Sequence, residues 1–482
     1  MATHTNEPVP AAAIVDTIAA VSTPPGRGGI GIVRLSGPES ASIAAQLVRL
    51  RQPLETEPGS ITWKHARASL ADVLDPQSAT SERIDEAVVT FFVAPNSYTG
   101  DDLVEIAAHG SPVILDLLLR QALALGARLA EPGEFTQRAF LAGKIDLTQA
   151  EAVRDLIEAQ TLTQARQAAS QMGGALSNRI APVKQSLVEL IALLEAGIDF
   201  AEDDVDVAPQ HEIARRITEL TPPLAALEAS FARGRIVHDG LTLAIVGRPN
   251  AGKSSLFNYL VERDRAIVTA TPGTTRDLVT ERISLDGIPL ELVDTAGLRD
   301  TLEEIEQLGI DRSRQALADA AIVLVVLDAT QPLNQEERNV LAAVHGRPAL
   351  VAINKSDLAN NGQARSVLHS DLSAALDAGL SAIPTSALTG DGIRTLREQI
   401  LALATGGASA EPGMLTNLRQ QRAVTTAQSS LHDAASANQS RIPHEMILLD
   451  LYRALWALDS LTGQTTPDDI LNLIFSTFCI GK

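Results

Sequence analysis

A glycine-rich segment, Gly247 to Ser255 (GRPNAGKSS), follows the apolar run LTLAIV and precedes a helix-like run, SLFNYLVE. The spacing G-x-x-x-x-G-K-S between a strand and a helix predicts a phosphate-binding loop, because glycines let backbone N–H groups approach the ligand and the helix N-terminus adds partial positive charge. Lys253 is expected to reach the β- and γ-phosphates, and the Ser254 hydroxyl to ligate Mg²⁺. The loop residues expected to contact a nucleotide are Asn250, Ala251, Gly252, Lys253, Ser254 and Ser255.

Three shorter motifs end or follow further apolar runs: DTAG (294–297), NKSD (354–357) and SAL (386–388). The carboxylate of Asp357 can accept hydrogen bonds from both N1–H and the exocyclic amine of guanine, a donor pair that adenine lacks, so this motif selects GTP over ATP. The four motifs in this order predict a guanine-nucleotide-binding domain. The expected contact residues of the shorter motifs are Asp294, Thr295, Ala296, Gly297, Asn354, Lys355, Asp357, Ser386, Ala387 and Leu388.

The position after DTAG bears on hydrolysis. Small GTPases carry a glutamine there, whereas this chain has Leu298, which cannot orient a water molecule. Another group must therefore position the attacking water, and the candidates are Glu303, Glu304 and Glu306 in RDTLEEIEQLG. From the residues alone, a solvated acidic helix start is the alternative interpretation for each of the three.

The distribution of strand-like and helix-like runs along the chain predicts a multidomain protein of α/β and α elements. Apolar runs alternate with helical stretches over 240–404, which indicates an inserted Ras-like, doubly wound α/β G domain, and Asp286-Gly287 predicts a hairpin turn within it. Residues 1–142 mix short strands, turns and a helix and are expected to form an α+β domain. The helical texture of 143–239 and 405–482 predicts one discontinuous helical domain whose halves pair across the insertion.

Composition restricts the possible classes of protein. The 482 residues include 45% hydrophobic but 3% aromatic residues, so the cores must be aliphatic. A single cysteine, Cys479, excludes an intrachain disulfide framework. No signal peptide or membrane span is recognisable, so we expect a cytoplasmic protein without membrane contact. The net charge of −20 argues against broad nonspecific binding to nucleic acid.

The whole chain resembles the family of tRNA-modification GTPases called MnmE or TrmE. The resemblance rests on TATPGTTRD (269–277) between the phosphate loop and DTAG, and on the flanking segments TPPGRGGIGIVRLSG (23–37), APNSYTGDDLVEIAAHG (94–110), EPGEFTQRAFLAGKIDL (131–147) and the terminal FCIGK (478–482). Pro272 and Leu388 are small departures from the family pattern. Pro272 would stiffen the segment Thr269 to Thr275, which corresponds to switch I of the family.

The resemblance implies a potassium-dependent GTPase. A K⁺ ion would take the place that an arginine finger has in other GTPases, and Thr275 would join Ser254 on Mg²⁺. Glu306, twelve positions beyond the Asp of DTAG, would orient the water, and face-to-face dimerisation of two G domains would activate hydrolysis. Gly273 falls in the nucleotide-binding switch segment. The implied K⁺ ligands are Asn250, Thr269, Thr271 and Thr274.

The resemblance also implies tRNA modification. An N-terminal homodimer would bind 5-formyltetrahydrofolate or a related folate through Arg34, Glu105, Lys144 and Lys482. The folate would supply the carbon with which an aminomethyl or carboxymethylaminomethyl group is added to C5 of the wobble uridine (position 34) of certain tRNAs. A flavoprotein partner, MnmG (GidA), would join the chain in a heterotetramer and bring FAD and NADH.

The role of Cys479 stays open at this point. A prenylation signal is excluded, because Gly481 and Lys482 do not fit it. Cys479 could act as a nucleophile on uridine, or the tail could simply complete the folate pocket around Lys482. Two other functions are open as alternatives: a regulatory or ribosome-assembly GTPase without one-carbon chemistry, and a folate-binding scaffold without turnover.

Overall fold

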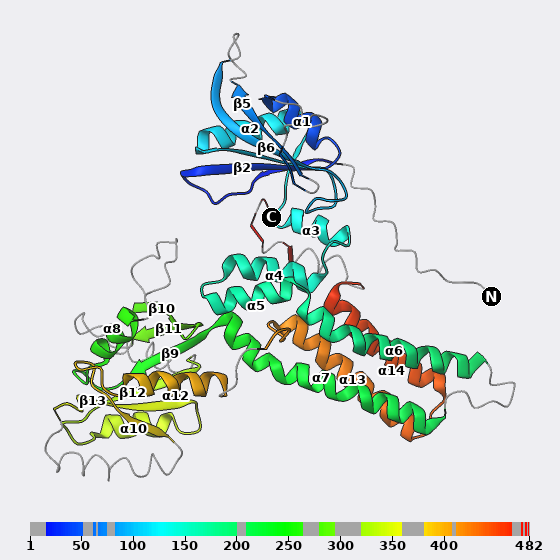
Figure 1. The fold of residues 1–482 in the computed structure, drawn as a ribbon. Helices are drawn as coiled ribbons and strands as arrows, with labels where there is room; N and C mark the ends of the chain where they lie inside the picture. Colours follow the sequence, from blue (N-terminus) through cyan, green and yellow to red (C-terminus); the bar gives the residue numbers. More distant parts are fainter. Residues whose placement is uncertain are drawn as a thin grey trace, which may run out of the picture. The chain divides into compact units, whose positions relative to one another are not determined.

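The computed structural model describes residues 16–51, 61–63, 66–74, 82–199, 209–263, 279–294, 320–358, 380–406, 411–464, 474–475, 478–479 and 481. The chain divides into two compact units, Met1–Arg154 with Asp459–Lys482, and Asp155–Leu458. Figure 1 shows the elements of both. The domain boundaries expected from the sequence stay predictions.

The first unit contains an eight-stranded, largely antiparallel sheet with the order β3-β5-β6-β7-β2-β1-β8, beside which β4 pairs with β5. β1 and β8 run parallel to each other. In β2, every second residue from Gly31 to Leu35 is buried, as expected for a strand with one face toward a core. The strands are β1 (Ile18–Val21), β2 (Gly28–Ser36), β3 (Val48–Leu50), β4 (Ile61–Trp63), β5 (Ala66–Leu74), β6 (Arg83–Phe92), β7 (Leu103–Gly110) and β8 (Arg128–Leu129).

Helices pack against this sheet through aliphatic residues. Helices α1 (Ser40–Leu47) and α2 (Pro112–Ala124) share a core with the inward residues of β2 and β7. Phe135 of α3 (Glu134–Leu141) packs instead with Ile18 and Ala20 of β1. Phe475 and Phe478, near the C-terminus, pack against the start of α4 (Leu147–Glu158). The end of the chain therefore belongs to the unit that contains its beginning.

The second unit contains a six-stranded sheet with the order β10-β11-β9-β12-β13-β14. The strands are β9 (Leu241–Val246), β10 (Val279–Leu285), β11 (Ile288–Asp294), β12 (Ile322–Asp328), β13 (Ala349–Asn354) and β14 (Ser381–Pro384). All neighbours are parallel except β10 and β11, which form the predicted hairpin. Asp286 and Gly287 at its turn have φ angles of 47° and 89°, the left-handed backbone that this two-residue turn requires.

Both faces of this parallel sheet are covered, which explains why its strands are continuous apolar runs. Helices α8 (Lys253–Arg263) and α12 (Ile393–Thr405) share one core with the sheet, and α10 (Gln335–Ala343) joins the core of the other face. Figure 1 shows α8 and α10 on opposite sides of the strands. This is the doubly wound architecture predicted from the sequence.

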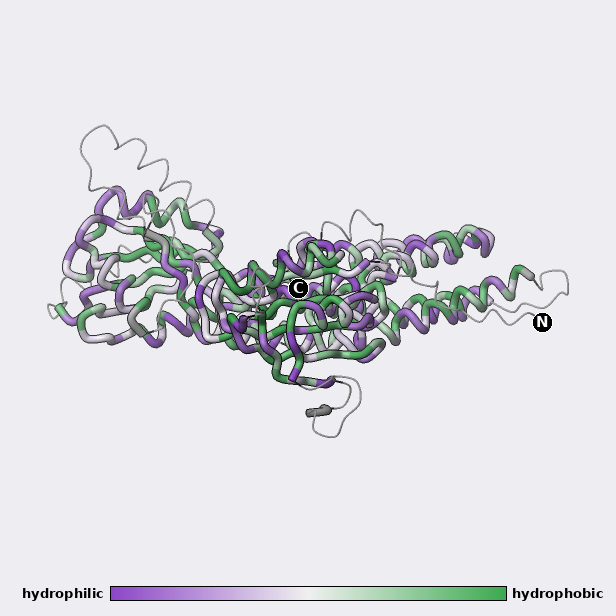
Figure 2. Tube along the Cα trace, turned by 90° about the horizontal axis from the view of Figure 1, so that it is seen from above, coloured by the Kyte–Doolittle hydropathy of each residue, from purple (hydrophilic) through white to green (hydrophobic). Residues whose placement is uncertain are grey.

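The remaining helices of the second unit form an elongated bundle, in which α7 packs along α13 and against α6. Tyr452 of α14 donates a hydrogen bond to Glu195 of α6, and Figure 1 shows these two helices side by side. Hydrophobic and hydrophilic residues alternate along the long helices in Figure 2, the pattern of amphipathic helices. The helices are α5 (Leu162–Met172), α6 (Ala175–Asp199), α7 (Gln210–Asp239), α13 (Leu418–Gln439) and α14 (His444–Thr462).

The helices in the described part of the chain include no candidate membrane span. None of the helices there combines the length and the apolar character needed to cross a bilayer.

Candidate nucleotide-binding site

The glycine-rich loop connects β9 to α8, as its sequence predicts. Gly247 has a φ of 149°, and a Cβ atom there would lie 2.2 Å from the carbonyl oxygen of Val326. At Gly252, with φ 91°, a Cβ would lie 2.1 Å from Nδ2 of Asn354. Side chains at either position would collide with neighbouring strand ends, so the loop can take this course only with glycine.

Lys253, at the first position of α8, is buried and folds back over the loop. Its Nζ donates hydrogen bonds of 2.9 Å to the carbonyl oxygens of Gly247 and Arg248. The adjacent Ser254 is exposed. The loop therefore combines an ammonium group, an accessible hydroxyl group and a helix N-terminus, a set that suits the phosphates of a nucleotide.

Asn354 joins the glycine-rich loop to two other predicted motifs. Its side chain is 2% exposed at the end of β13, where Nδ2 donates to the carbonyl oxygen of Ala251 (3.0 Å) and Oδ1 accepts from the backbone N–H of Ala387 (3.1 Å). Thus the loops after β9, β13 and β14 meet at one edge of the sheet. In an open parallel sheet, ligands bind outside this carboxyl edge.

Lys355, the next residue, makes a second connection. It has a φ of 63°, and its Nζ donates to the carbonyl oxygen of Asn250 (2.7 Å) and pairs with Oδ2 of Asp328 (2.8 Å). Burial alone would raise the pKa of Asp328, but hydrogen bonds from Lys355 and Thr330 hold it below its usual value. Asp328 is therefore an anion that fixes Lys355 against the loop, a role that the sequence alone does not indicate.

The residues expected to read guanine lie at the same edge. Asp357 is half-buried three residues beyond the end of β13, and the backbone of Ser356 donates to the carbonyl oxygen of Thr385. Leu388 is 84% exposed, so its side chain contributes little to this packing. The position of Asp357 beside the SAL loop is compatible with its expected contact to guanine.

Part of the predicted site lies outside the described residues. Asp294 ends β11, as expected, but its side chain is not among those described. The other predicted residues outside the description are Thr269, Thr271, Gly273, Thr274, Thr275, Thr295, Ala296, Gly297, Glu306 and Lys482.

Two of the predicted folate ligands meet in the first unit. Arg34 of β2 lies opposite Glu105 of β7 in the strand register, and its guanidinium pairs with the Glu105 carboxylate at 2.6 Å. Arg34 also lies 5.5 Å from the centre of the Phe135 ring and donates to the carbonyl oxygen of Gly481 (3.3 Å). A cation, a carboxylate and the end of the chain are thus brought together.

The C-terminal backbone fits closely against β1 and its following loop. Gly481 has a φ of 94°, and a Cβ there would lie 2.6 Å from the carbonyl oxygen of Val21. The Ser22 hydroxyl also donates to the carbonyl oxygen of Gly481 (2.9 Å). The thiol-bearing residue Cys479 is exposed and accepts a hydrogen bond from the Gly133 backbone.

Lys144, the third described folate candidate, contacts the loop between β6 and β7. Its Nζ donates to the carbonyl oxygen of Pro95, and its side chain lies beside Gly100. Tyr98 lies in the same loop, and its hydroxyl group is 3.0 Å from that of Thr136 in α3. Burial raises the pKa of Tyr98, so its phenol stays neutral. Lys144 is therefore held by a different set of contacts from the Arg34–Glu105 pair.

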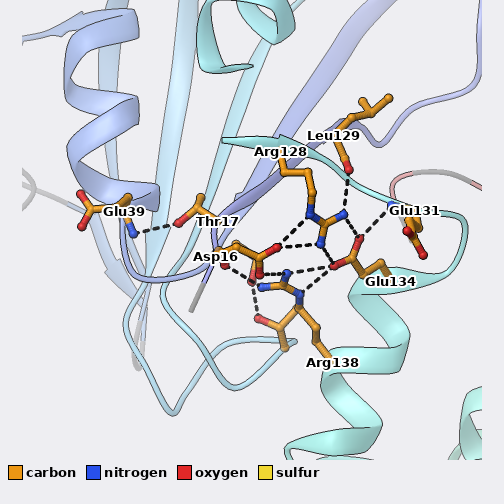
Figure 3. A network of polar contacts seen from close by, with 10 residues as sticks. Asp16, Thr17, Glu39, Arg128, Leu129, Glu131, Glu134 and Arg138 are labelled. Atoms are coloured by element: carbon orange, nitrogen blue, oxygen red, sulfur yellow. Dashed lines mark hydrogen bonds and ion pairs between the residues drawn. The ribbon is translucent and has the colours of Figure 1, made fainter. Parts of the chain in front are cut away.

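A partly buried ionic network supports α3 and was not recognised from the sequence (Figure 3). Arg138 pairs with Glu134 (2.9 Å) and Asp16 (2.8 Å), and Arg128 pairs with the same two carboxylates. Burial opposes ionisation of Asp16 and Glu134, yet the arginines outweigh it and lower both pKa values. Because α3 carries Phe135, the network fixes the helix on which Arg34 rests.

A second unrecognised cluster lies within the second unit, where α7 ends and β9 begins. His238 Nε2 lies 3.1 Å from Asp155, and its Nδ1 lies 2.7 Å from Asp239. The hydrogen bond that His238 donates to the Asp155 carboxylate is the main cause that raises the pKa of His238 to about 9. Thr161, which caps α5, donates to the carbonyl oxygen of Gly287 in the β10–β11 turn (2.7 Å). These contacts border a cavity of about 730 Å³.

Comparison with known proteins adds evidence that is independent of this geometry. Residues 147–479 match the model described as "MnmE helical domain", and residues 17–144 match "GTP-binding protein TrmE N-terminus". A tRNA modification GTPase MnmE from Koribacter versatilis is 56% identical over 97% of this chain and 99% of its own length. The chain belongs to the MnmE family of tRNA modification GTPases.

Other members of the MnmE family are also similar along almost their whole length. The proteins from Roseiflexus castenholzii and Alkaliphilus oremlandii are 41% and 38% identical over 97% of this chain, and over 99% and 100% of their own lengths. A crystal structure of the G domain of T. maritima FeoB is 26% identical over 34% of this chain and 98% of that chain, with a TM-score of 0.26. Membership of the MnmE family confirms the predicted fold class: an N-terminal domain, a helical domain and a G domain.

Proposed function

We propose that the chain is a K⁺-dependent GTPase that works with a flavoprotein to add an aminomethyl or carboxymethylaminomethyl group to C5 of the wobble uridine in certain tRNAs. The observation that supports the GTPase part most strongly is the joining of three loops by the buried side chain of Asn354. Membership of the MnmE family supports the link to tRNA modification.

The described residues of the nucleotide site have separable roles in this proposal. The Lys253 ammonium group neutralises charge on the β- and γ-phosphates, and the loop N–H groups hold the phosphates in place. The Asp357 carboxylate accepts from guanine, while Asn354 keeps its loop in register with the phosphate loop. Glu306 orients the attacking water, the task for which Leu298 is unsuited.

The residues at this site fit Mg²⁺ and K⁺. The exposed Ser254 hydroxyl and Thr275 would hold Mg²⁺, and the exposed Asn250 with Thr269, Thr271 and Thr274 would hold K⁺. Bound K⁺ supplies positive charge between the phosphates in the transition state. Within the described residues, no group of three or more His, Cys, Asp or Glu side chains is placed to hold a metal. Hydroxyl, amide and phosphate oxygens are therefore the expected ligands.

The first unit carries charged groups that suit the polar ends of a folate. The Arg34–Glu105 pair provides a cation for a carboxylate and a carboxylate for the paired donors of a pterin. Lys144 and Lys482 would add cations, and a bound folate supplies a one-carbon unit. The close fit of Gly481 against Val21 holds the Gly481 carbonyl oxygen within hydrogen-bond distance of Arg34.

The partners follow from charge and from the resemblance. A chain with a net charge of −20 is poorly suited to binding tRNA alone, so a flavoprotein that carries FAD and uses NADH would provide much of the tRNA surface. The assembly would contain two copies of this chain, which associate through their N-terminal domains and, during hydrolysis, through their G domains.

The GTPase part can be tested by measuring GTP turnover in KCl and NaCl at equal ionic strength. We expect turnover to be higher in KCl and the difference to disappear in Asn250→Ala. Equal turnover of the wild-type protein in the two salts would contradict the proposed K⁺ site.

For the folate part, an extension after Lys482 should weaken binding of 5-formyltetrahydrofolate while GTP binding is retained.

A further inference from the structure

Helix α14 exposes a row of large side chains that its own fold does not cover. Met446, Leu449 and Trp456 are 53%, 57% and 57% exposed, and Ile442 in the preceding turn is 40% exposed. Arg453 lies between them, with 64% of its side chain exposed. We call these five residues the α14 stripe. Ile442 precedes the helix, and the spacing of 3, 4 and 3 residues places the other four along one side of α14.

The opposite side of α14 is already buried in the bundle. Ile447, Leu451, Ala454 and Leu458 are at most 1% exposed. A helix that has buried one apolar face normally presents polar residues to solvent, and large contiguous apolar patches are unusual on free surfaces. Trp456, one of two tryptophans in the chain, lies there beside Tyr452, with ring centroids 6.0 Å apart. Such residues are typical of the centres of protein interfaces.

We propose that the α14 stripe is the docking surface for an amphipathic helix of the flavoprotein partner, with an acidic residue facing Arg453. The 3-4-3 spacing of the four helical members is the repeat by which two helices pack along a common seam. Arg453 interrupts the apolar seam and pairs only at 3.3 Å with Asp450 on its own helix, an exposed contact of little strength. A carboxylate on the partner would pair with Arg453 more strongly once water is excluded.

A groove beside the stripe strengthens this assignment. The groove lies between α13 and α14, has a volume of about 890 Å³, and is lined by Trp456 and Arg453 on one side and by Arg422 and Thr425 on the other. The groove is lined by two arginines and one carboxylate, Asp433, and this excess of positive charge favours an acidic occupant, whereas the chain as a whole is strongly acidic. The groove would receive side chains that flank the seam of the docked helix.

Two other occupants fit the observations less well. A second copy of this chain would bring an identical stripe, whose five residues include no carboxylate for Arg453. An RNA strand would leave the apolar side chains of Met446 and Leu449 uncovered, because its backbone offers charge but no apolar face. An acidic amphipathic helix satisfies both the apolar and the charged parts of the surface.

The test measures the affinity of the purified flavoprotein for the full-length chain by isothermal titration calorimetry. Leu449→Glu places a charge at the centre of the stripe and is expected to weaken binding at least tenfold. Arg453→Gln should weaken it severalfold, and Arg453→Glu should weaken it more, because reversal adds repulsion from the partner's carboxylate. Leu403→Glu, at a 42% exposed leucine on α12, is the matched control and should change the affinity less than twofold.

The outcomes separate this inference from the proposed function on which its partner rests. If the wild-type chain does not bind the flavoprotein, the proposed partnership fails and this inference fails with it. If the wild type binds and Leu449→Glu binds equally well, the α14 surface is refuted while the partnership stands. A change in the oligomeric state of the chain alone, or in its tRNA affinity, without a change in flavoprotein affinity would also refute it and would identify the other occupant.

Discussion

The histidine at the junction of α7 and β9 makes the stability of the second unit depend on pH. His238 has a pKa of about 9 in the folded protein, chiefly because of the Asp155 hydrogen bond, whereas an unperturbed histidine titrates near pH 6.5. The folded state binds the His238 proton more tightly than the unfolded state does, so protonation stabilises the fold. This stabilisation is fully present below about pH 6.5. It is lost as the pH rises through 9.

The size of the effect follows from the pKa difference. A difference of this size corresponds to about 3 kcal/mol in the free energy of unfolding. Asp239 is 52% exposed, and solvent screens its share, which reduces the expected value to about 2 kcal/mol. Asp155, by contrast, is 7% exposed and keeps most of its interaction with His238.

The assay compares urea unfolding of the wild-type chain and His238→Gln at pH 6 and pH 10, followed by circular dichroism. The difference in the free energy of unfolding between the two proteins at each pH cancels the contributions of groups that titrate equally in both. We expect the wild type's advantage over the variant to decrease by about 2 kcal/mol between pH 6 and pH 10. His211→Gln, at an exposed position on the same helix, is the control and should show a smaller change. An advantage that is independent of pH, or that grows with pH, would refute the reasoning.

Four further changes test the two candidate sites. Asn354→Ala leaves two buried backbone groups unpaired and should cost about 2–4 kcal/mol of stability with a parallel loss of GTP affinity, measured by urea unfolding and nucleotide titration. Asp357→Asn should shift the base preference toward xanthine, and retention of full GTP preference in competition binding would contradict the assigned contact. Glu306→Ala should keep nucleotide affinity and lose turnover in a phosphate-release assay; unchanged turnover would move the role to another group. Glu134→Gln removes one of the two carboxylates that pair with the buried Arg138 and should destabilise the first unit by about 2 kcal/mol at pH 7 in urea unfolding. Because the folded pKa of Glu134 is lowered, this stabilisation should disappear as the pH falls through the folded pKa, and a loss that persisted at low pH would refute the assignment.

Local features of the fold could be predicted from the sequence. The apolar runs became the strands β9, β11, β12, β13 and β14, because a sheet covered on both faces needs such runs whatever its neighbours are. The Asp286-Gly287 turn was also predictable, because its backbone angles depend on only these two adjacent residues. The place of Lys253 in the phosphate-binding loop was predictable, because the residues of that motif follow one another in a single loop.

Features that depend on distant segments could not be predicted. Asn354 was expected to contact a nucleotide, but its bridge between the loops of Ala251 and Ala387 depends on how three strand ends approach each other. The i,i+4 pair of Glu134 and Arg138 could have been noticed on one helix, whereas Asp16 comes from 122 residues away. The exposure of the α14 stripe likewise depends on which side of the helix the bundle buries.

The most direct test of the proposed function is nucleoside analysis of the wobble uridines of tRNA from cells that lack this protein. The account predicts that the C5 aminomethyl or carboxymethylaminomethyl group is missing from these uridines and returns when the wild-type gene is restored. It also predicts that a gene carrying Glu306→Ala does not restore the modification. Intact C5 modification in cells that lack the protein would contradict the central claim and leave only the nucleotide-binding site standing.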